Sequence, residues 1–536
     1  MDLVTAAEMR ALDCAAIEER QIPSLRLMEN AGKAVVQEMV RHFGPLRGKT
    51  VTIVSGKGQN GGDGFVVARL LRQQGCTARV ALLSPPSALK GDAATTLRRF
   101  QRAGGRVHPI PSGVGVGGGP APPEAGAPPT RIDPVSVLGP LLQRSDLLVD
   151  AIFGTGLNAP VEGLPATAIQ LMNASGRPIV AIDLPSGLDA DTGAVLGAAI
   201  TAMLTVTLAC PKRGLYLGVG PNHAGMVRVA DIGIPPDLMA AAKIPVTLLD
   251  AAQVRPWLPV RSRTAHKGTC GHAGIIAGSV GKTGAATMAA LGALRVGAGL
   301  VTVATPRSLN DVLEAKLLEA MTVPVPETEA RTLSTKALAP LLAFATDKTA
   351  MAIGPGIGTH PETKALVHSL LSSLTRPIVL DADGLNAVAG HRELLSTVHA
   401  PLLVTPHPGE MARLLEVSTA DVQKDRLGAA TRLAQEHKVY VVLKGAGTVV
   451  AAPDGRLVVN STGNPGMATA GTGDVLTGML VGLLAQGLSP WEAACTGVYL
   501  HGLAGDLAAA DQGETGLIAG DVIQAIPRAI RRVLEK

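Results

Sequence analysis

The sequence predicts an α/β protein of two domains, each with a mostly parallel sheet covered by helices. Its length of 536 residues exceeds what a single hydrophobic core usually serves. Short β-branched runs alternate with helical stretches, which is typical of βαβ units. Aromatic residues make up only 2% of a chain that is 46% hydrophobic. Ala, Val, Leu and Gly must therefore form the core, as suits buried parallel strands and closely packed helices. We expect the domains over residues 1–240 and 250–536.

In the first domain, apolar β-branched runs predict a series of parallel strands. A Gly-rich loop follows the first of them, and a helix is expected from about residue 65 to 74. The segment 112–129 is almost entirely Gly, Pro, Ala and Val, so we expect a flexible surface insertion with no catalytic role. The expected strands are 50–55, 78–83, 147–152, 178–182 and 204–210.

A proline-rich stretch, 232–263, marks the expected domain boundary. A second βαβ series begins after it, in which an Ala/Gly-rich helix lies between the first two strands. Such small residues indicate close helix packing. The expected strands of the second domain are 274–277, 300–304, 350–353, 378–381, 402–405, 440–443 and 449–452.

Composition and charge exclude several classes of protein. The net charge of +5 is mild and the basic residues are scattered, so nucleic-acid binding is not expected. Five widely spaced cysteines without a CxxC motif indicate reduced thiols rather than a disulfide framework or a zinc site. Acidic residues among positions 1–20 argue against a signal or transit peptide, and no apolar run is long enough to cross a bilayer. We expect a cytoplasmic protein without a membrane partner.

The run Gly471-Thr472-Gly473-Asp474 is the most informative motif, because it places a carboxylate on the first turn of an apolar helix. A helix N-terminus presents free backbone N–H groups and a positive dipole end, which attract phosphate. Asp474 can then act as a base on a substrate hydroxyl while the amides hold a phosphoryl group. The alternative is that Asp474 only caps the helix. The residues expected on one apolar face of this helix are Val475, Leu476, Met479, Leu480, Leu483 and Leu484.

The loop after the first expected strand contains a G-x-G-x-x-G pattern, at Gly56, Gly58 and Gly61. Between a strand and a helix, such glycines let backbone amides approach a phosphate. A dinucleotide-dependent dehydrogenase would also carry an acidic residue at the end of its second strand to bind a ribose. Here that strand ends in Leu82-Leu83-Ser84, which argues against hydride transfer.

Two further expected strands end in the carboxylates Asp150 and Asp183, each followed by a Gly-rich segment. Ligands of open α/β sheets bind at the carboxyl ends of the strands, so these acids and the Gly-rich loop should converge. Asn60, Asp150 and the region of Ser186 would supply hard oxygen donors, which suit an alkali or alkaline-earth cation better than zinc. The alternative is that both acids only bind loop amides, but two of them in Gly-rich strand-end loops favour a site.

Residues from about 5 to 234 resemble the NAD(P)H-hydrate epimerase domain. The motifs that carry the resemblance are Ile22–Leu25, Met28–Gly32, Asn60–Gly64, Asp150–Gly156 and Asp183–Gly193. The resemblance implies a Rossmann-like three-layer αβα fold, a potassium ion bound by Asn60, Asp150 and Ser186, and Asp183 as the acid/base. Gln59 stands where the family often has Asn, and the insertion 112–129 is atypical. The implied contacts to the hydrated dinucleotide are Gln59, Asn60, Gly61, Gly62, Asp63, Gly154, Thr155, Gly156, Leu157, Asn158, Ala159, Pro160 and Asp183.

In the second domain, three more loops that follow expected strands carry candidate ligand-binding residues. Gly354–Gly358 could let the backbone approach a ligand, and His407 is held between two prolines. Lys444 and Thr448 place a cation and a hydroxyl where a nucleotide could bind. The alternatives are a structural role for His407 and a solvated turn position for Lys444.

Residues from about 260 to 535 resemble the ADP/ATP-dependent NAD(P)H-hydrate dehydratase, a branch of the ribokinase-like αβα fold. The motifs that carry the resemblance are Lys267-Gly268 with Gly271-His272, Gly278–Ala286, Gly354–Gly358, Thr405–Glu410, Lys444–Thr448 and Ala470–Asp474. The implied nucleotide site comprises Lys444, Gly445, Ala446, Gly447, Thr448 and Gly473. The implied contacts to the hydrated nicotinamide are Ala285, Gly356, His407 and Asp474.

Fusion of both domains is the pattern of the bacterial bifunctional NAD(P)H-hydrate repair enzymes. It implies that the first domain interconverts the R and S epimers of hydrated NADH and NADPH. The second would restore NAD(P)H from the S epimer with Mg²⁺ and ADP, ATP being the alternative donor. Asp474 would deprotonate the hydroxyl, which takes phosphate from ADP to leave AMP, and the ring nitrogen would then expel the phosphate. The implied partners are these small molecules and further copies of the chain in a homo-oligomer.

Two rival interpretations remain. The second domain could be a kinase for a vitamin-precursor alcohol, because such kinases share the fold. The first could be a non-catalytic module that binds dinucleotides, although the presence of both Asp150 and Asp183 argues against this.

Overall fold

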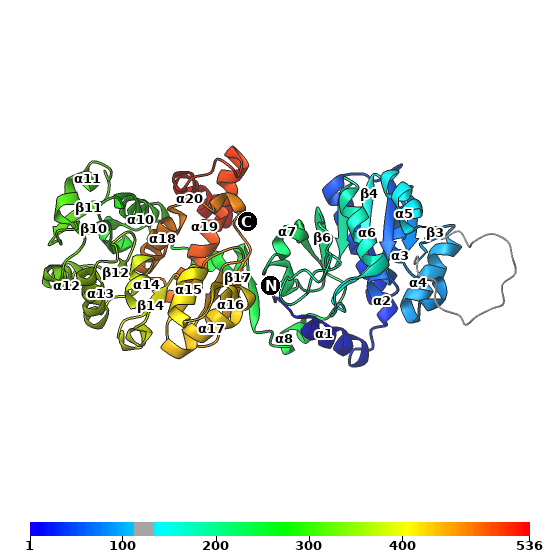
Figure 1. Ribbon diagram of the computed structural model, residues 1–536, viewed down its shortest axis with the longest axis horizontal. Helices are drawn as coiled ribbons and strands as arrows, with labels where there is room; N and C mark the ends of the chain where they lie inside the picture. The colour runs from blue at the N-terminus through cyan, green and yellow to red at the C-terminus, as the bar shows by residue number, and fades with distance from the viewer. Residues whose placement is uncertain (112–132, 536) are drawn as a thin grey trace, which may run out of the picture. The chain divides into compact units, whose positions relative to one another are not determined.

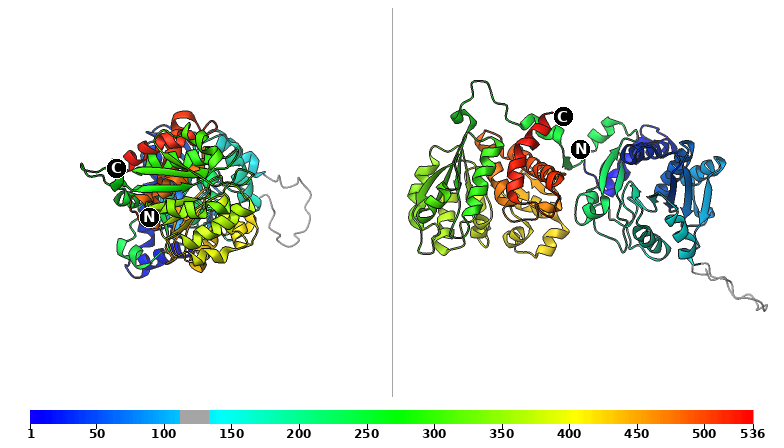
Figure 2. Two further views of the ribbon diagram at one scale, coloured as in Figure 1. Left: turned by 90° about the vertical axis from the view of Figure 1, so that its left-hand side faces the viewer. Right: turned by 90° about the horizontal axis from the view of Figure 1, so that it is seen from above.

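The computed structural model describes residues 1–111 and 133–535. The chain divides into two compact units, Met1–Ile244 and Pro245–Lys536, and the division falls inside the proline-rich stretch (Figure 1). Each unit is built on one sheet with helices packed against it (Figure 2). The predicted α/β fold class is therefore confirmed. The insertion expected over 112–129 lies outside the described residues.

The sheet of the first unit has seven strands, all parallel, in the order β3-β2-β1-β4-β5-β6-β7. The order reverses between β1 and β4, as in doubly wound dinucleotide-binding folds. The strands are β1 (Thr50–Ser55), β2 (Thr77–Leu82), β3 (Arg106–Pro109), β4 (Leu147–Ala151), β5 (Ile179–Ile182), β6 (Leu204–Leu208) and β7 (Met226–Ala230). The helices are α1 (Ala6–Glu18), α2 (Ser24–Phe43), α3 (Gln59–Gln73), α4 (Gly91–Arg102), α5 (Pro134–Gln143), α6 (Gly163–Ala174), α7 (Gly220–Ala224) and α8 (Pro236–Ala241).

Buried side chains of the central strand β1 point alternately to the two faces of the sheet, and helices cover both faces, which gives this unit three layers. Successive side chains of a strand point to opposite faces of the sheet. Val51 and Ile53 pack with buried side chains of α2, α3 and α4, whereas Val54 packs with those of α5 and α6. Each face of the sheet thus has its own apolar core.

Helix α3 begins at Gln59, six residues earlier than the expected position near 65, so most of the predicted Gly-rich loop is helical. The glycines allow this because they bring the helix close to the sheet. A Cβ at Gly61 would lie 2.2 Å from the carbonyl oxygen of Gly56, and one at Gly64 would lie 2.6 Å from Cβ of Ala151. The glycines are needed for helix–sheet packing as well as for any approach to a ligand.

The sheet of the second unit has ten strands, in the order β11-β10-β9-β12-β13-β14-β15-β16-β17-β8. Strands β9 to β15 are parallel, β16 is antiparallel to both its neighbours, and β8 pairs in parallel with β17. The strands are β8 (Val246–Leu249), β9 (His272–Ile276), β10 (Leu300–Pro306), β11 (Met321–Val325), β12 (Ala350–Ile353), β13 (Ile378–Leu380), β14 (Leu402–Val404), β15 (Tyr440–Leu443), β16 (Val449–Ala451) and β17 (Leu457–Asn460).

Helices α10, α18, α19 and α20 share the main apolar core of this unit with the strands, and α12 to α17 lie on the other side of the sheet (Figure 1). The helices are α9 (Ala251–Val254), α10 (Thr283–Val296), α11 (Asn310–Glu314), α12 (Leu338–Ala345), α13 (Pro361–Ser373), α14 (Asp383–Val388), α15 (Pro408–Leu415), α16 (Thr419–Lys424), α17 (Arg426–His437), α18 (Thr472–Ala485), α19 (Pro490–Gln512) and α20 (Ala519–Leu534). Across residues 1–111 and 133–535, no helix combines the length and apolarity that crossing a membrane requires.

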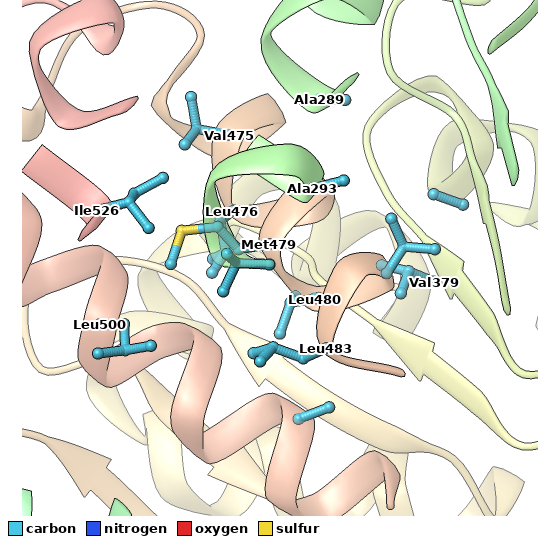
Figure 3. Close-up of a cluster of buried hydrophobic side chains, with 14 of the residues drawn as sticks. Ala289, Ala293, Val379, Val475, Leu476, Met479, Leu480, Leu483, Leu500 and Ile526 are labelled. Atoms are coloured by element: carbon cyan, nitrogen blue, oxygen red, sulfur yellow. The ribbon is translucent and has the colours of Figure 1, made fainter. Parts of the chain in front are cut away.

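Helix α18 is the centre of this core. Figure 3 shows its apolar side chains among Ala289 and Ala293 of α10, Leu500 of α19 and Ile526 of α20. The six residues expected on one apolar face are buried, but so is every other residue from Val475 to Ala485, because neighbours surround the helix. The position of its N-terminus is consequently fixed by packing on all sides.

Candidate active sites

The first unit contains a cavity of about 510 Å³ at the carboxyl ends of β1, β4 and β5, where the strand order reverses. Helices α1 and α2 complete its wall. The predicted substrate contacts that line it are Gln59, Asn60, Asp63, Gly154, Thr155, Gly156, Leu157 and Asp183. The predicted contacts outside its lining are Gly61, Gly62, Asn158, Ala159 and Pro160. Gly61 and Gly62 pack instead against Gly56 and Met28.

The three predicted cation ligands are drawn together around the backbone of Phe153, at the end of β4. The Asn60 amide donates to the Phe153 carbonyl oxygen at 2.7 Å, and the Ser186 hydroxyl lies 2.8 Å from the Phe153 nitrogen. Asp150 accepts hydrogen bonds from the Ser186 hydroxyl at 2.5 Å and from its backbone nitrogen at 2.7 Å. Burial raises the pKa of Asp150 to about 6, although these hydrogen bonds lower it.

The oxygen Oδ1 of Asn60 is buried and has no hydrogen-bond partner in the described part of the chain. A buried oxygen without a partner, in a cluster with a hydroxyl and a carboxylate, is a hard donor set that fits an alkali or alkaline-earth cation. The part played by Phe153 was not predicted, because hydrogen bonds to a backbone have no sequence signature.

Asp183 follows β5 in a left-handed conformation, with φ of 68°, which is uncommon for a residue other than glycine. Its oxygen Oδ1 forms an ion pair with Lys212 and accepts from the Leu208 nitrogen at 3.1 Å. Lys212 is 1% exposed and also donates to the carbonyl oxygen of Leu208 at 2.8 Å. The other oxygen, Oδ2, accepts no hydrogen bond from residues 1–111 or 133–535 and lies near Gly154. Asp183 thus has one carboxylate oxygen held by an ion pair and a hydrogen bond, and a second oxygen available to a ligand.

In the second unit, Asp474 is the third residue of α18, and Gly471 occupies the N-cap position with φ of 92°. No side chain caps this helix end, so the alternative that Asp474 is merely a cap does not hold. Burial raises the pKa of Asp474 to about 7, helped by the charge of Asp381 and opposed by that of Lys444. A carboxyl with this pKa can exchange protons near neutral pH.

Lys444 lies in the middle of an ionic network at this helix end. Its ammonium is 2.6 Å from Asp381 and 3.8 Å from Glu410, and the Thr477 hydroxyl of α18 donates to Asp381 at 2.5 Å. Burial lowers the pKa of Lys444, but the charges of Asp381 and Glu410 outweigh it and the pKa is raised. Lys444 is therefore a half-buried cation held in place by ion pairs, and the alternative of a solvated turn position is wrong.

Of the remaining predicted residues of this site, His407 contacts the network through Glu410, whereas Ala285 and Gly356 contact each other. His407 caps α15 by accepting from the Gly409 nitrogen at 3.0 Å, and its ring lies 3.5 Å from Glu410. A Cβ at Gly356 would lie 3.1 Å from that of Ala285, so these two residues are in contact.

The loop Lys444–Thr448 is fixed by Arg426, which sequence reasoning missed. Its guanidinium donates to the carbonyl oxygens of Leu443 and Lys444, both at 3.1 Å. The Thr448 hydroxyl donates to Gly445 at 2.9 Å. Gly473 is adjacent, since its Cβ position is 3.6 Å from the Lys444 ammonium. The structure adds three candidate functional residues that are recognised only by their contacts in the folded chain: Asp381, Glu410 and Arg426.

Comparison with known proteins now identifies the family. A family model described as NAD(P)H-hydrate dehydratase matches residues 273–528, and one described as YjeF-related protein N-terminus matches 24–214. A bifunctional NAD(P)H-hydrate repair enzyme of Moorella thermoacetica is 47% identical over 100% of this chain and 98% of the relative. The chain belongs to the bifunctional NAD(P)H-hydrate repair enzymes. The predicted resemblance and enzyme class are thus confirmed.

One more repair enzyme and one solved structure are also similar to this chain. The Escherichia coli member is 37% identical over 94% of this chain and 89% of the relative. Among solved structures, an ADP/ATP-dependent NAD(P)H-hydrate dehydratase of Bacillus subtilis, co-crystallized with ATP and Mg²⁺, is 33% identical. It covers 54% of this chain and 99% of its own, with a TM-score of 0.47.

Proposed function

We propose that residues 1–240 interconvert the R and S epimers of hydrated NADH and NADPH, and that residues 250–536 dehydrate the S epimer with ADP. The observation that carries this proposal is the pair of separate carboxylate sites, one in each unit. Asp183 presents a free oxygen to the first cavity, and Asp474 stands at a helix N-terminus beside Lys444, a half-buried lysine in an ionic network. Family membership supplies the class of substrate.

In the first unit we assign the hydrated nicotinamide to the cavity, with Asp183 as the acid/base. The contacts proposed from the resemblance remain Gln59 to Asp63, Gly154 to Pro160 and Asp183. A potassium ion bound by Asn60, Asp150 and Ser186 would add positive charge beside the substrate. The unpartnered oxygen of Asn60 supports this ligand set.

In the second unit, Asp474 takes the proton from the substrate hydroxyl, and the oxygen attacks the terminal phosphate of ADP, so that AMP leaves. The free amides at the N-terminus of α18 and the Lys444 ammonium stabilise the transferred charge. The ring nitrogen then expels phosphate and restores NAD(P)H. We assign the nucleotide to Lys444–Thr448 and Gly473, and the hydrated nicotinamide to Ala285, Gly356, His407 and Asp474.

Mg²⁺ would neutralise phosphate charge in this reaction. Among the residues that the structure describes, no group of three or more His, Cys, Asp or Glu side chains is arranged to hold a metal ion. We therefore propose that Mg²⁺ arrives with the nucleotide, as its phosphate counter-ion.

We further propose that the protein works in the cytoplasm as a homo-oligomer. All five cysteines are free, as expected for a reducing compartment. Leu318, just before the edge strand β11, is 88% exposed, and Met321, the first residue of that strand, is 45% exposed, which offers apolar surface for assembly.

The decisive experiment mixes purified protein with both epimers of hydrated NADH, Mg²⁺, K⁺ and either ADP or ATP, and follows the absorbance of regenerated NADH. Full recovery with one nucleotide establishes both activities and the phosphate donor. Recovery that stops once the S epimer is consumed contradicts the epimerase assignment. A stable phosphorylated product without NADH would show a small-molecule kinase instead.

A further inference from the structure

The cavity of the first unit contains ionisable groups that the mechanism above uses only in part. Asp13 of α1 and Asp63 of α3 line the same cavity as the Asp183–Lys212 ion pair. Asp92, Lys57 and Arg10 also line the cavity, so four carboxyls share this space with two lysines and an arginine. Lys212 pairs with Asp183, whereas Asp13 and Asp63 form no ion pair within residues 1–111 and 133–535.

Asp13 is half-buried, and no residue of the described chain donates a hydrogen bond to its carboxyl or forms an ion pair with it. Burial raises the pKa of Asp13 to about 6; Lys212 lowers it and Asp183 raises it. Asp183, by contrast, is held by a buried ammonium. Such an arrangement separates the roles of two carboxyls, one a proton donor and the other a base.

Helix α1 is anchored to the segments that carry the rest of the site, which fixes Asp13 relative to Asp183. Glu8 closes a capping box with Thr5 and pairs with Arg213, the residue after Lys212, at 3.1 Å. The Ala6 nitrogen donates to Asp191, beyond Asp183 in the same loop, at 2.6 Å.

We propose that Asp13 is a second catalytic residue of the first unit, the proton donor that acts together with Asp183. The inference rests on the proposed epimerase function. It goes beyond the contacts assigned above, none of which comes from α1.

The proposed mechanism starts from a hydrated nicotinamide whose hydroxyl is on the carbon next to the ring nitrogen. Asp183 accepts the hydroxyl proton through Oδ2, the carbon–nitrogen bond breaks with its electron pair passing to nitrogen, and Asp13 protonates that nitrogen. The aldehyde formed rotates and presents its other face. Nitrogen then adds to it, Asp13 recovers its proton, and Asp183 returns the other proton to oxygen. No atom or electron is gained or lost, and the oxygen stays bound to carbon throughout. This agrees with the second unit, where the hydroxyl has to be phosphorylated before it can leave.

Asp63 is the rival for this role, because it is also without a partner and burial raises its pKa well above the usual value. It lies one helical turn from Asn60 in α3, however, and so its charge depends on the cation proposed there. Asp13 comes from a separate helix. The charged and titratable groups around it are Arg10 of its own helix, the cavity-lining Lys57, Asp63, Asp92, Asp183 and Lys212, and Cys210.

The test uses the full chain with purified R hydrate of NADH and no nucleotide, and follows interconversion of the epimers by nuclear magnetic resonance across pH. Asp13→Asn should lower the epimerisation rate about 100-fold or more and remove the decline of the rate at high pH. Dehydration of the S epimer should be unchanged in the same preparation. Glu18→Gln, an exposed charge on the same helix, is the control and should leave both activities unaltered.

A wild-type rate in Asp13→Asn would overturn the proposal. So would an alkaline decline that persists in Asp13→Asn and disappears in Asp63→Asn. A wild-type chain that does not interconvert the epimers would instead refute the epimerase function itself, so the two failures are distinguishable.

Discussion

At the scale of single residues, Asp474 and Asp183 depend on charges that come from elsewhere in the chain. Asp474 owes its raised pKa to burial and to Asp381, and Asp183 owes its fixed orientation to Lys212. Sequence reasoning located Asp183 because it follows an apolar strand, and Asp474 because it begins an apolar helix; both are local signals. It missed Lys212 and Glu410, because an ion pair between distant segments leaves no local pattern. Asp381 also follows an apolar strand, but sequence reasoning took it only as the last residue of that strand.

Asp474→Asn should lower dehydration of the S epimer by about 100-fold or more, since general base catalysis contributes at least that much. Nucleotide affinity should change little, because Lys444 and the helix amides remain. NADH absorbance and calorimetric nucleotide binding measure the two quantities. The control is Asp454→Asn, an exposed carboxylate in the turn between β16 and β17. Undiminished turnover in Asp474→Asn would refute the role of base.

The raised pKa of Asp474 also predicts how stability depends on pH. Between its ordinary value of 3.8 and about 7, the unfolded chain ionises Asp474 while the folded chain keeps it protonated. The Asp474 contribution to stability is therefore fully present below pH 4 and is lost as pH rises through 7. Asp474→Asn should remove this dependence, so the variant should melt at a higher temperature than the wild type at pH 8. Thermal unfolding at pH 4.5, 6 and 8 checks the difference, and identical pH slopes would contradict it.

The cation cluster predicts a stabilising effect of potassium. Replacing KCl by tetramethylammonium chloride at equal ionic strength should lower the melting temperature of the first unit, because the Asn60 oxygen and Asp150 lose their counter-ion. Asn60→Ala should remove most of the difference between the two salts. Scanning calorimetry measures it, and an equal potassium response in both proteins would count against this site.

At the scale of elements, the predicted strands are those in the middle of each sheet. Strands β1, β12 and β15 occur as predicted, because buried parallel strands read as continuous apolar runs. The strands that sequence analysis missed are β3, β7, β8, β11 and β17. The first four are the edges of the two sheets and the fifth adjoins an edge. Residues of β3, β7 and β11 are largely exposed or half-buried, so the apolar signal is interrupted there.

Close packing of α10 against α18 gives a prediction at this scale. A Cβ at Gly478 would lie 1.9 Å from the Ala289 carbonyl oxygen, and backbone cannot yield cheaply. Gly478→Ala should destabilise the second unit by about 1–3 kcal/mol and reduce dehydration, because α18 carries Asp474. Gly516→Ala, where a Cβ meets nothing within 4 Å, is the control. Denaturant unfolding compares them, and equal midpoints would contradict the packing argument.

At the scale of the whole molecule, the chain forms two compact units, and we propose that each carries one of the two activities. An Asp183→Ala chain should therefore restore NADH from an equimolar mixture of epimers only until the S form is consumed, apart from slow spontaneous epimerisation. Adding an Asp474→Asn chain, which is inactive alone, should raise recovery to completion, because each variant retains the activity that the other lacks. NADH absorbance measures both stages. Failure of the mixture to exceed the first chain alone would show that the two reactions need one intact polypeptide.

Strand β8 determines where a gene that encodes both units could be divided into two genes. It lies only a few residues after the division at Ile244, yet it completes the far edge of the second sheet by pairing with β17. A break placed at the end of the proline-rich stretch would leave β17 as a bare edge, open to pairing with other chains. A break before Pro245 keeps both sheets whole. Where the two activities are encoded by separate genes, or are newly fused, we therefore expect the boundary to lie on the N-terminal side of this strand.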